Sequence, residues 1–119
     1  MRLPLAFLAP LAAAAPAFAD PAAIVSAEAS RAADGWRFDV TIAHEETGWD
    51  DYANGWRVLG PDGAVLGTRV LAHPHPDEQP FTRSLSGVAI PDGVEEVAIQ
   101  SSTLATGWSG ETLALRLPD

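Results

Sequence analysis

The 119-residue sequence contains no cysteine and no lysine, and its single methionine is Met1. The lack of cysteine excludes disulfides, thiol catalysis, thiolate metal sites and redox exchange. A Cu(I) site built from soft sulfur ligands has nothing to be made from once Met1 is removed. No apolar run after residue 15 is long enough to cross a bilayer as a helix, so residues 20–119 are expected to be soluble.

Positive charge is also scarce. All seven basic residues are arginines and none forms a cluster, whereas sixteen residues are acidic, for a formal net charge of −9. Such a surface repels phosphate backbones and anionic lipids, so nucleic-acid binding is not expected. Cations or basic partners are favoured; alternatively, the charge only confers solubility on an exported domain.

The first nineteen residues have the pattern of a secretory signal peptide. Arg2 is a minimal positive start, residues 3–15 form a short apolar run interrupted by prolines, and residues 17–19 (Ala-Phe-Ala) fit the small-x-small cleavage pattern. We therefore expect residues 1–19 to be cleaved and Asp20 to begin a periplasmic or secreted protein. Residues 20–119 are enough for a single domain with one core.

That domain is predicted to be all-β. Gly, Pro, Asn or Asp residues interrupt it every eight to twelve positions, and the runs between them alternate between apolar and polar side chains. The first run, which is rich in alanine, would also suit a helix. The predicted strands are residues 21–30, 36–44, 56–59, 64–72, 81–90, 94–102 and 112–117.

The run from residue 36 to residue 44 is the clearest strand. Trp36, Phe38, Val40, Ile42 and His44 fall on one face, and the residues between them are Arg, Asp, Thr and Ala. Alternate residues of a strand point to opposite faces of its sheet, so the apolar face is predicted to lie in the core.

Seven short strands in about one hundred residues match an immunoglobulin-like sandwich. In addition, residues 85–93, residues 94–100 and the hairpin that contains Gly107 resemble fibronectin type III and related bacterial domains, a resemblance that covers roughly residues 56–117. This resemblance implies a fold but does not imply an activity. Glu95 and Glu96 stand where those domains commonly carry a corner tyrosine. As a whole, the chain looks like small exported proteins of alphaproteobacteria.

The sandwich topology predicts where the unusual loops meet. Successive antiparallel strands alternate in direction, so the connections after the second, fourth and sixth strands emerge at one end of the sandwich. These connections are residues 45–55, 73–80 and 103–110, and the other end receives only plain turns. All three histidines, together with Trp49, Tyr52 and Trp108, are therefore expected at or beside one end, where such domains usually bind their partners.

His73 and His75 form the centre of a candidate metal site. Each precedes a proline, which favours an extended backbone, and in a β conformation their side chains point the same way about 6–7 Å apart at Cα. In a polyproline II conformation the two rings diverge instead. His44 is the candidate third ligand, and a sulfur-free imidazole site suits Cu²⁺ or Zn²⁺. The acids offered as further ligands, or as acceptors that orient the rings, are Glu45, Glu46, Asp50, Asp51, Asp77 and Glu78.

The alternative needs no metal. In that interpretation the prolines only turn the chain, His44 is a strand-end residue on the apolar face, and the acids are solvated. Trp49 and Trp108 lie in loops and could be either exposed contacts or buried anchors, and we expect anchors, whereas the strand tryptophans are expected in the core.

Two hypotheses for function follow. The first is a binding module that holds Cu²⁺ or Zn²⁺ through His44, His73 and His75. The second is an envelope interaction domain that docks another protein through Trp49, Tyr52 and Trp108. An enzyme is not expected, because the sequence has no phosphate-binding glycine loop and residues 107–110 (Gly-Trp-Ser-Gly) lack the spacing of a nucleophile elbow.

Overall fold

A computed structural model of the chain describes residues 20–119. The predicted signal peptide, residues 1–19, lies outside the described residues. Within the described part, no helix has the length and the apolar character needed to cross a membrane.

Strands are the only regular secondary structure in the described residues, which confirms the all-β prediction. Eight strands form two antiparallel sheets, one more strand than the sequence predicted. Their bounds are β1 Ala23–Ala32, β2 Gly35–Ala43, β3 Ala53–Leu59, β4 Val65–Val70, β5 Phe81–Val88, β6 Glu96–Thr103, β7 Gly107–Trp108 and β8 Leu113–Arg116.

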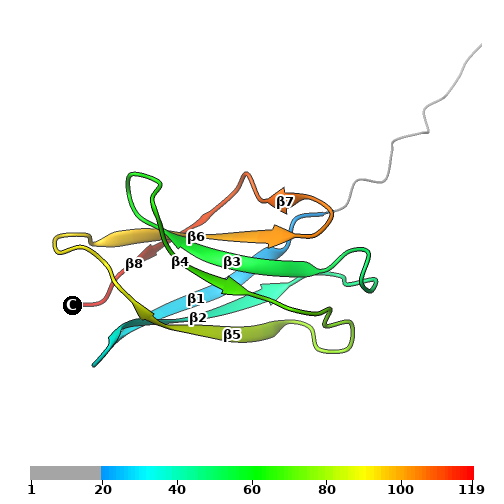
Figure 1. The fold of residues 1–119 in the computed structure, drawn as a ribbon, viewed down its shortest axis with the longest axis horizontal. Coiled ribbons are helices and arrows are strands. Elements are labelled where there is room, and N and C mark those ends of the chain that lie inside the picture. Colours follow the sequence, from blue (N-terminus) through cyan, green and yellow to red (C-terminus); the bar gives the residue numbers. More distant parts are fainter. Residues whose placement is uncertain (1–19) are drawn as a thin grey trace, which may run out of the picture.

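The two sheets lie one over the other (Figure 1). The smaller sheet has the strand order β1-β2-β5, and the larger has the order β4-β3-β6, with β7 and β8 both paired to the far side of β6. Strands that are neighbours in sequence often lie in different sheets. The core is therefore assembled from contacts between distant parts of the chain.

The core lies between the sheets and follows the predicted alternation. In β2, Trp36, Phe38, Val40 and Ile42 are at most 7% exposed, as the sequence predicted. Trp56 of β3 is fully buried and contributes the largest buried side chain. Burying one such apolar side chain stabilises the fold by roughly 1.5–3 kcal/mol, so this row of alternate residues fixes which face of β2 points inward.

The additional strand is β7. Only two of its residues pair with β6, Gly107 with Thr103 and Trp108 with Ser102, so the sequence pattern was too short to reveal it. The turn before it is closed by the Thr103 hydroxyl, which accepts a hydrogen bond of 2.9 Å from the backbone N–H of Thr106. Gly107 has a φ of +74°, a left-handed conformation that glycine adopts without steric cost.

The predicted gathering of loops at one end is confirmed. The β2–β3, β4–β5 and β6–β7 connections lie at the same end of the sandwich, and the β1–β2, β3–β4 and β5–β6 turns lie at the opposite end (Figure 1). Two hydrogen bonds link the loops directly, from the Leu104 N–H to the Tyr52 carbonyl at 2.9 Å and from the His75 N–H to Glu46 at 3.1 Å. We call this end the loop pole.

Candidate functional site

A buried carboxylate, Glu46, is the centre of the loop pole. Its side chain is fully buried, and it contacts groups from three places in the chain. Oε2 lies 2.5 Å from Nδ1 of His44 and accepts a hydrogen bond of 2.8 Å from the N–H of Ala53. Oε1 accepts the N–H of His75 at 3.1 Å. One carboxylate therefore joins the end of β2, the start of β3 and the β4–β5 loop.

The second group of this network is His44, whose side chain is 3% exposed. Its Nδ1 faces the Glu46 carboxylate, and its Nε2 faces the carbonyl oxygen of Asp20 at 3.1 Å. A carboxylate and a carbonyl are both acceptors, so both ring nitrogens of His44 already face hydrogen-bond partners within the protein. Neither nitrogen has a lone pair directed at open space, as a metal ligand requires.

Gln79 completes the connection between the two loops. Its Oε1 accepts the backbone N–H of His44 at 2.9 Å, and its Nε2 donates to the carbonyl of His75 at 3.1 Å. Gln79 was not among the residues predicted from the sequence, because a glutamine in a proline-rich loop carries no spacing signal. The one sequence feature that could have indicated Gln79 is its position in the same loop as His73 and His75.

His73 and His75 lie together but face different surroundings. Their ring centroids are 4.5 Å apart at an interplanar angle of 38°. His75 is buried and stacks on Phe81 at 4.2 Å, whereas His73 is exposed and its Nδ1 lies 3.0 Å from the carbonyl oxygen of Pro74. Nδ1 of His75 is buried without a hydrogen-bond partner among residues 20–119 and lies 3.8 Å from Oε1 of Glu46.

This setting favours a neutral imidazole at His75. Burial lowers its pKa below the ordinary value of 6.5, and the positive charges of Arg83 and His73 lower it further, against the opposing effect of Glu46. Nearby, Glu78 pairs with Arg83 at 3.0 Å, and the hydrogen bond from Arg83 lowers the pKa of Glu78. Asp77 is exposed beside it.

Acid is therefore expected to destabilise the protein through His75. Because the folded-state pKa of His75 lies below its unfolded value, the unfolded state binds the proton more tightly, and stability is full above pH 6.5 and falls as the pH drops below it. His75→Phe keeps a ring on Phe81 and has no proton to gain. Its melting temperature should fall less than that of the wild type between pH 7.5 and pH 5. An NMR titration that places the His75 pKa at or above 6.5 would contradict this account.

The three predicted metal ligands do not form one site. His73 and His75 are in contact, but His44 uses both ring nitrogens within the Glu46 network. Among residues 20–119, no three His, Asp or Glu side chains are arranged to hold a metal ion. Binding of Cu²⁺ or Zn²⁺ remains a prediction, restricted by this geometry to the His73–His75 pair.

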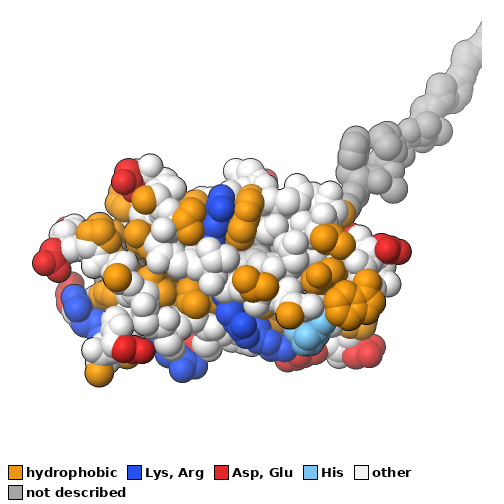
Figure 2. Space-filling model, in the orientation of Figure 1, with side chains coloured by type: hydrophobic (Ala, Val, Ile, Leu, Met, Phe, Trp, Pro, Cys, Tyr) orange, Lys and Arg blue, Asp and Glu red, His pale blue; other side chains and the backbone are white. Residues whose placement is uncertain are grey.

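The loop aromatic residues are more exposed than expected. Trp49 is 66% exposed and meets Tyr52 edge to face at 5.7 Å, and Trp108 is 40% exposed. The preference for buried anchors was therefore wrong for both tryptophans. Figure 2 shows hydrophobic side chains beside a histidine and several acids at the loop pole.

Trp108 lies on the outer surface of the larger sheet. The guanidinium of Arg57 stacks 3.9 Å from its ring centroid, and Arg57 is itself held by a hydrogen bond of 2.8 Å to Gln100. A side-chain carbon at Gly55 would lie 3.7 Å from the Trp108 ring, so glycine there lets the indole lie close to the sheet. Trp108 is thus fixed in place by its neighbours, whereas Trp49 projects from the loop pole.

Comparison with known proteins adds one distant relative. The chain is 35% identical over 78 residues to a protein of Halomicrobium mukohataei described as a "putative lipoprotein". The match covers 66% of this chain, and the chain spans about 38% of the length of that relative. No family model matches the sequence, and no solved structure matches it.

Proposed function

We propose that this protein is an exported, non-enzymatic binding module with a fibronectin type III-like fold, which docks another envelope protein through the aromatic residues Trp49, Tyr52 and Trp108. The strand orders β1-β2-β5 and β4-β3-β6-β8 support the fold, because they are those of the A-B-E and C′-C-F-G sheets of such domains. The predicted signal peptide and the description of the relative as a lipoprotein support export.

The proposal rests on the exposure of Trp49, which lies on a loop that hydrogen bonds to Glu46 hold in place. A tryptophan that is 66% exposed leaves a large apolar area in water, and tryptophan is among the residues most enriched at energetically dominant interface positions. The loop that presents it is fixed by Glu46, so little conformational freedom is lost on binding. The surrounding acids favour a partner with basic groups.

Site-specific crosslinking in the native envelope tests this proposal. A photoreactive side chain in place of the exposed Asp50 should give one discrete adduct, and the same group in place of Asp92, at the opposite end of the sandwich, should give none. Trp49→Ser should remove the adduct, because loss of a central interface tryptophan costs roughly 2 kcal/mol or more of binding free energy. An adduct that persists in Trp49→Ser would contradict docking at the loop pole.

The His73–His75 contact supports a second candidate function, which is binding of Cu²⁺ or Zn²⁺. Calorimetry of residues 20–119 with either ion should then show binding near pH 7 that is lost when both histidines are replaced by alanine. The same double variant, and a chelator, leave the aromatic docking complex intact and so separate the two functions. Absence of binding by the unmutated protein removes the metal proposal.

A further inference from the structure

The side of the sandwich formed by β1 and β8 is open. Among the described residues, β1 pairs only with β2 and β8 pairs only with β6, so both sheets end on this side with unpaired backbone edges. The free edge of β1 runs for ten residues, from Ala23 to Ala32. An exposed edge of this length is a template for pairing with another extended chain.

The core is incompletely covered along this side. Ile24, Ala27 and Ala29 of β1 pair with buried residues of β2, and Leu113 and Leu115 of β8 pair with buried residues of β6. These five side chains therefore point inward, yet all are only half-buried. Apolar surface that belongs to the core thus faces an opening between the two strands.

The opposite side, between β4 and β5, is closed. A side-chain carbon at Gly67 of β4 would lie 3.0 Å from Leu85 and 3.2 Å from Val88 of β5. Glycine at this position lets the side chains of Leu85 and Val88 pack against the backbone of β4. The opening between β1 and β8 is therefore a feature of one side of the molecule and not of the fold as a whole.

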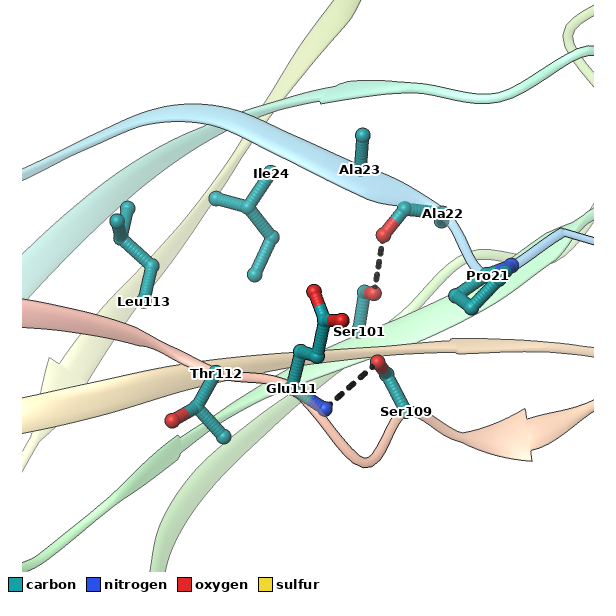
Figure 3. A pocket seen from close by; sticks show the side chains of 9 residues that line it. All are labelled: Pro21, Ala22, Ala23, Ile24, Ser101, Ser109, Glu111, Thr112 and Leu113. Carbon is teal, nitrogen blue, oxygen red and sulfur yellow. Dashed lines mark hydrogen bonds between the residues drawn. The ribbon is translucent and has the colours of Figure 1, made fainter.

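Two cavities lie along the open side. One, of about 350 Å³, lies between the start of β1 and the segment that leads into β8, and the other, of about 590 Å³, lies between Ala27–Ala29 and the residues after Leu115. We call the two together the seam groove. Figure 3 shows Ile24 and Leu113 directed toward one another across the first cavity, with the Glu111 carboxylate pointing into it.

Glu111 gives the first cavity a negative charge. Its backbone N–H donates to the Ser109 hydroxyl at 3.0 Å, but its carboxylate has no ion pair or hydrogen bond within residues 20–119. The hydroxyl of Ser101 in the same cavity is already used, because it donates to the Ala22 carbonyl at 2.6 Å. Glu111 is exposed, so the group available to a ligand here is a solvated carboxylate without an ion pair, beside apolar side chains.

From these features we infer that the seam groove binds an extended segment of a partner protein, which pairs with the free edge of β1 and places a lysine or arginine against Glu111. A strand added beside β1 would extend the smaller sheet over the groove, and every second side chain would point inward and cover Leu113 and Leu115. The Glu111 carboxylate, which makes no ion pair within residues 20–119, and the chain's net charge of −9 favour a basic occupant.

Two matched peptides test the inference. Both are nine residues long and blocked at both ends, and both alternate valine and serine; the central inward residue is lysine in one and glutamate in the other. By calorimetry at low salt, the protein should bind the lysine peptide about tenfold more tightly, since attraction to Glu111 replaces repulsion. Amide NMR shifts should change in β1 and in residues 111–115 and not at Trp49.

Protein variants in which an acidic residue is replaced by lysine supply the control. Glu111→Lys should reverse the preference so that the glutamate peptide binds more tightly, whereas Asp92→Lys, which changes the net charge equally at an exposed turn, should leave it unchanged. Equal binding of the two peptides, or no saturable binding of either, would overturn the inference. A dimer of the protein alone that buries β1 would overturn it too, because a second copy would then fill the groove.

Discussion

Replacing Glu46 by alanine is expected to lower the free energy of unfolding by about 3–5 kcal/mol. The substitution removes one partner of a buried pair and leaves His44 with a hydrogen-bond donor that faces no acceptor. It also leaves the N–H groups of Ala53 and His75 without their acceptor. Chemical denaturation monitored by tryptophan fluorescence measures the change.

The matched control is the neighbouring residue. Glu45 is exposed and its side chain makes no ion pair in the described structure, so Glu45→Gln should change stability by less than about 0.5 kcal/mol. Glu46→Gln, the same chemical change one position later, should cost roughly 1–3 kcal/mol, because an amide nitrogen then meets donors where an oxygen accepted them. Equal effects of the two amide substitutions would show that the Glu46 network does not hold the loops.

Two tryptophans on the larger sheet should respond very differently to the same change. Trp56 is fully buried, and Trp56→Ala should cost about 3–5 kcal/mol, since it leaves a large cavity between the sheets. Trp108 is 40% exposed and packs mainly against Arg57 and the backbone at Gly55. Trp108→Ala should cost about 1 kcal/mol through loss of the cation–π contact and a part of the buried area.

Thermal and chemical denaturation of both variants measure this difference. If Trp108→Ala destabilises the protein as strongly as Trp56→Ala, Trp108 serves the fold and is not available as a docking residue. A small loss of stability at Trp108 is what a surface contact residue requires.

Much of the fold follows from local sequence patterns. The alternation in residues 36–44 predicted the inward face of β2, and the interrupting Gly, Pro, Asn and Asp residues placed the strand boundaries within a few residues. The short strand β7 was missed, because two paired residues produce no alternation. The start of β3 at Ala53 was missed as well, since Asn54 and Gly55 are typical of turns and only pairing with the neighbouring strands β4 and β6 holds them in a strand.

The location of the candidate site could be predicted from the sequence, but the chemical roles of its residues could not. Strand direction alone brought His44, the His73–His75 loop and Trp49 to one end of the sandwich. The sequence could not show which of the neighbouring acids would be buried, and the structure selects Glu46 while Glu45, Asp50 and Asp77 face solvent. Because Glu46 is the buried acid, His44 is part of an internal hydrogen-bond network and is not free to bind a metal ion.

The sequence by itself determined the fold class, the inward face of the strands, the absence of thiol chemistry and the end of the molecule where the loops meet, because these depend on residue type and on short-range periodicity. Only the tertiary structure decided that the proline-rich segment from residue 72 to residue 81 is tied to Glu46, that Trp49 is exposed, and that the side between β1 and β8 is open. These features depend on distances between residues far apart in the chain, which no local pattern specifies.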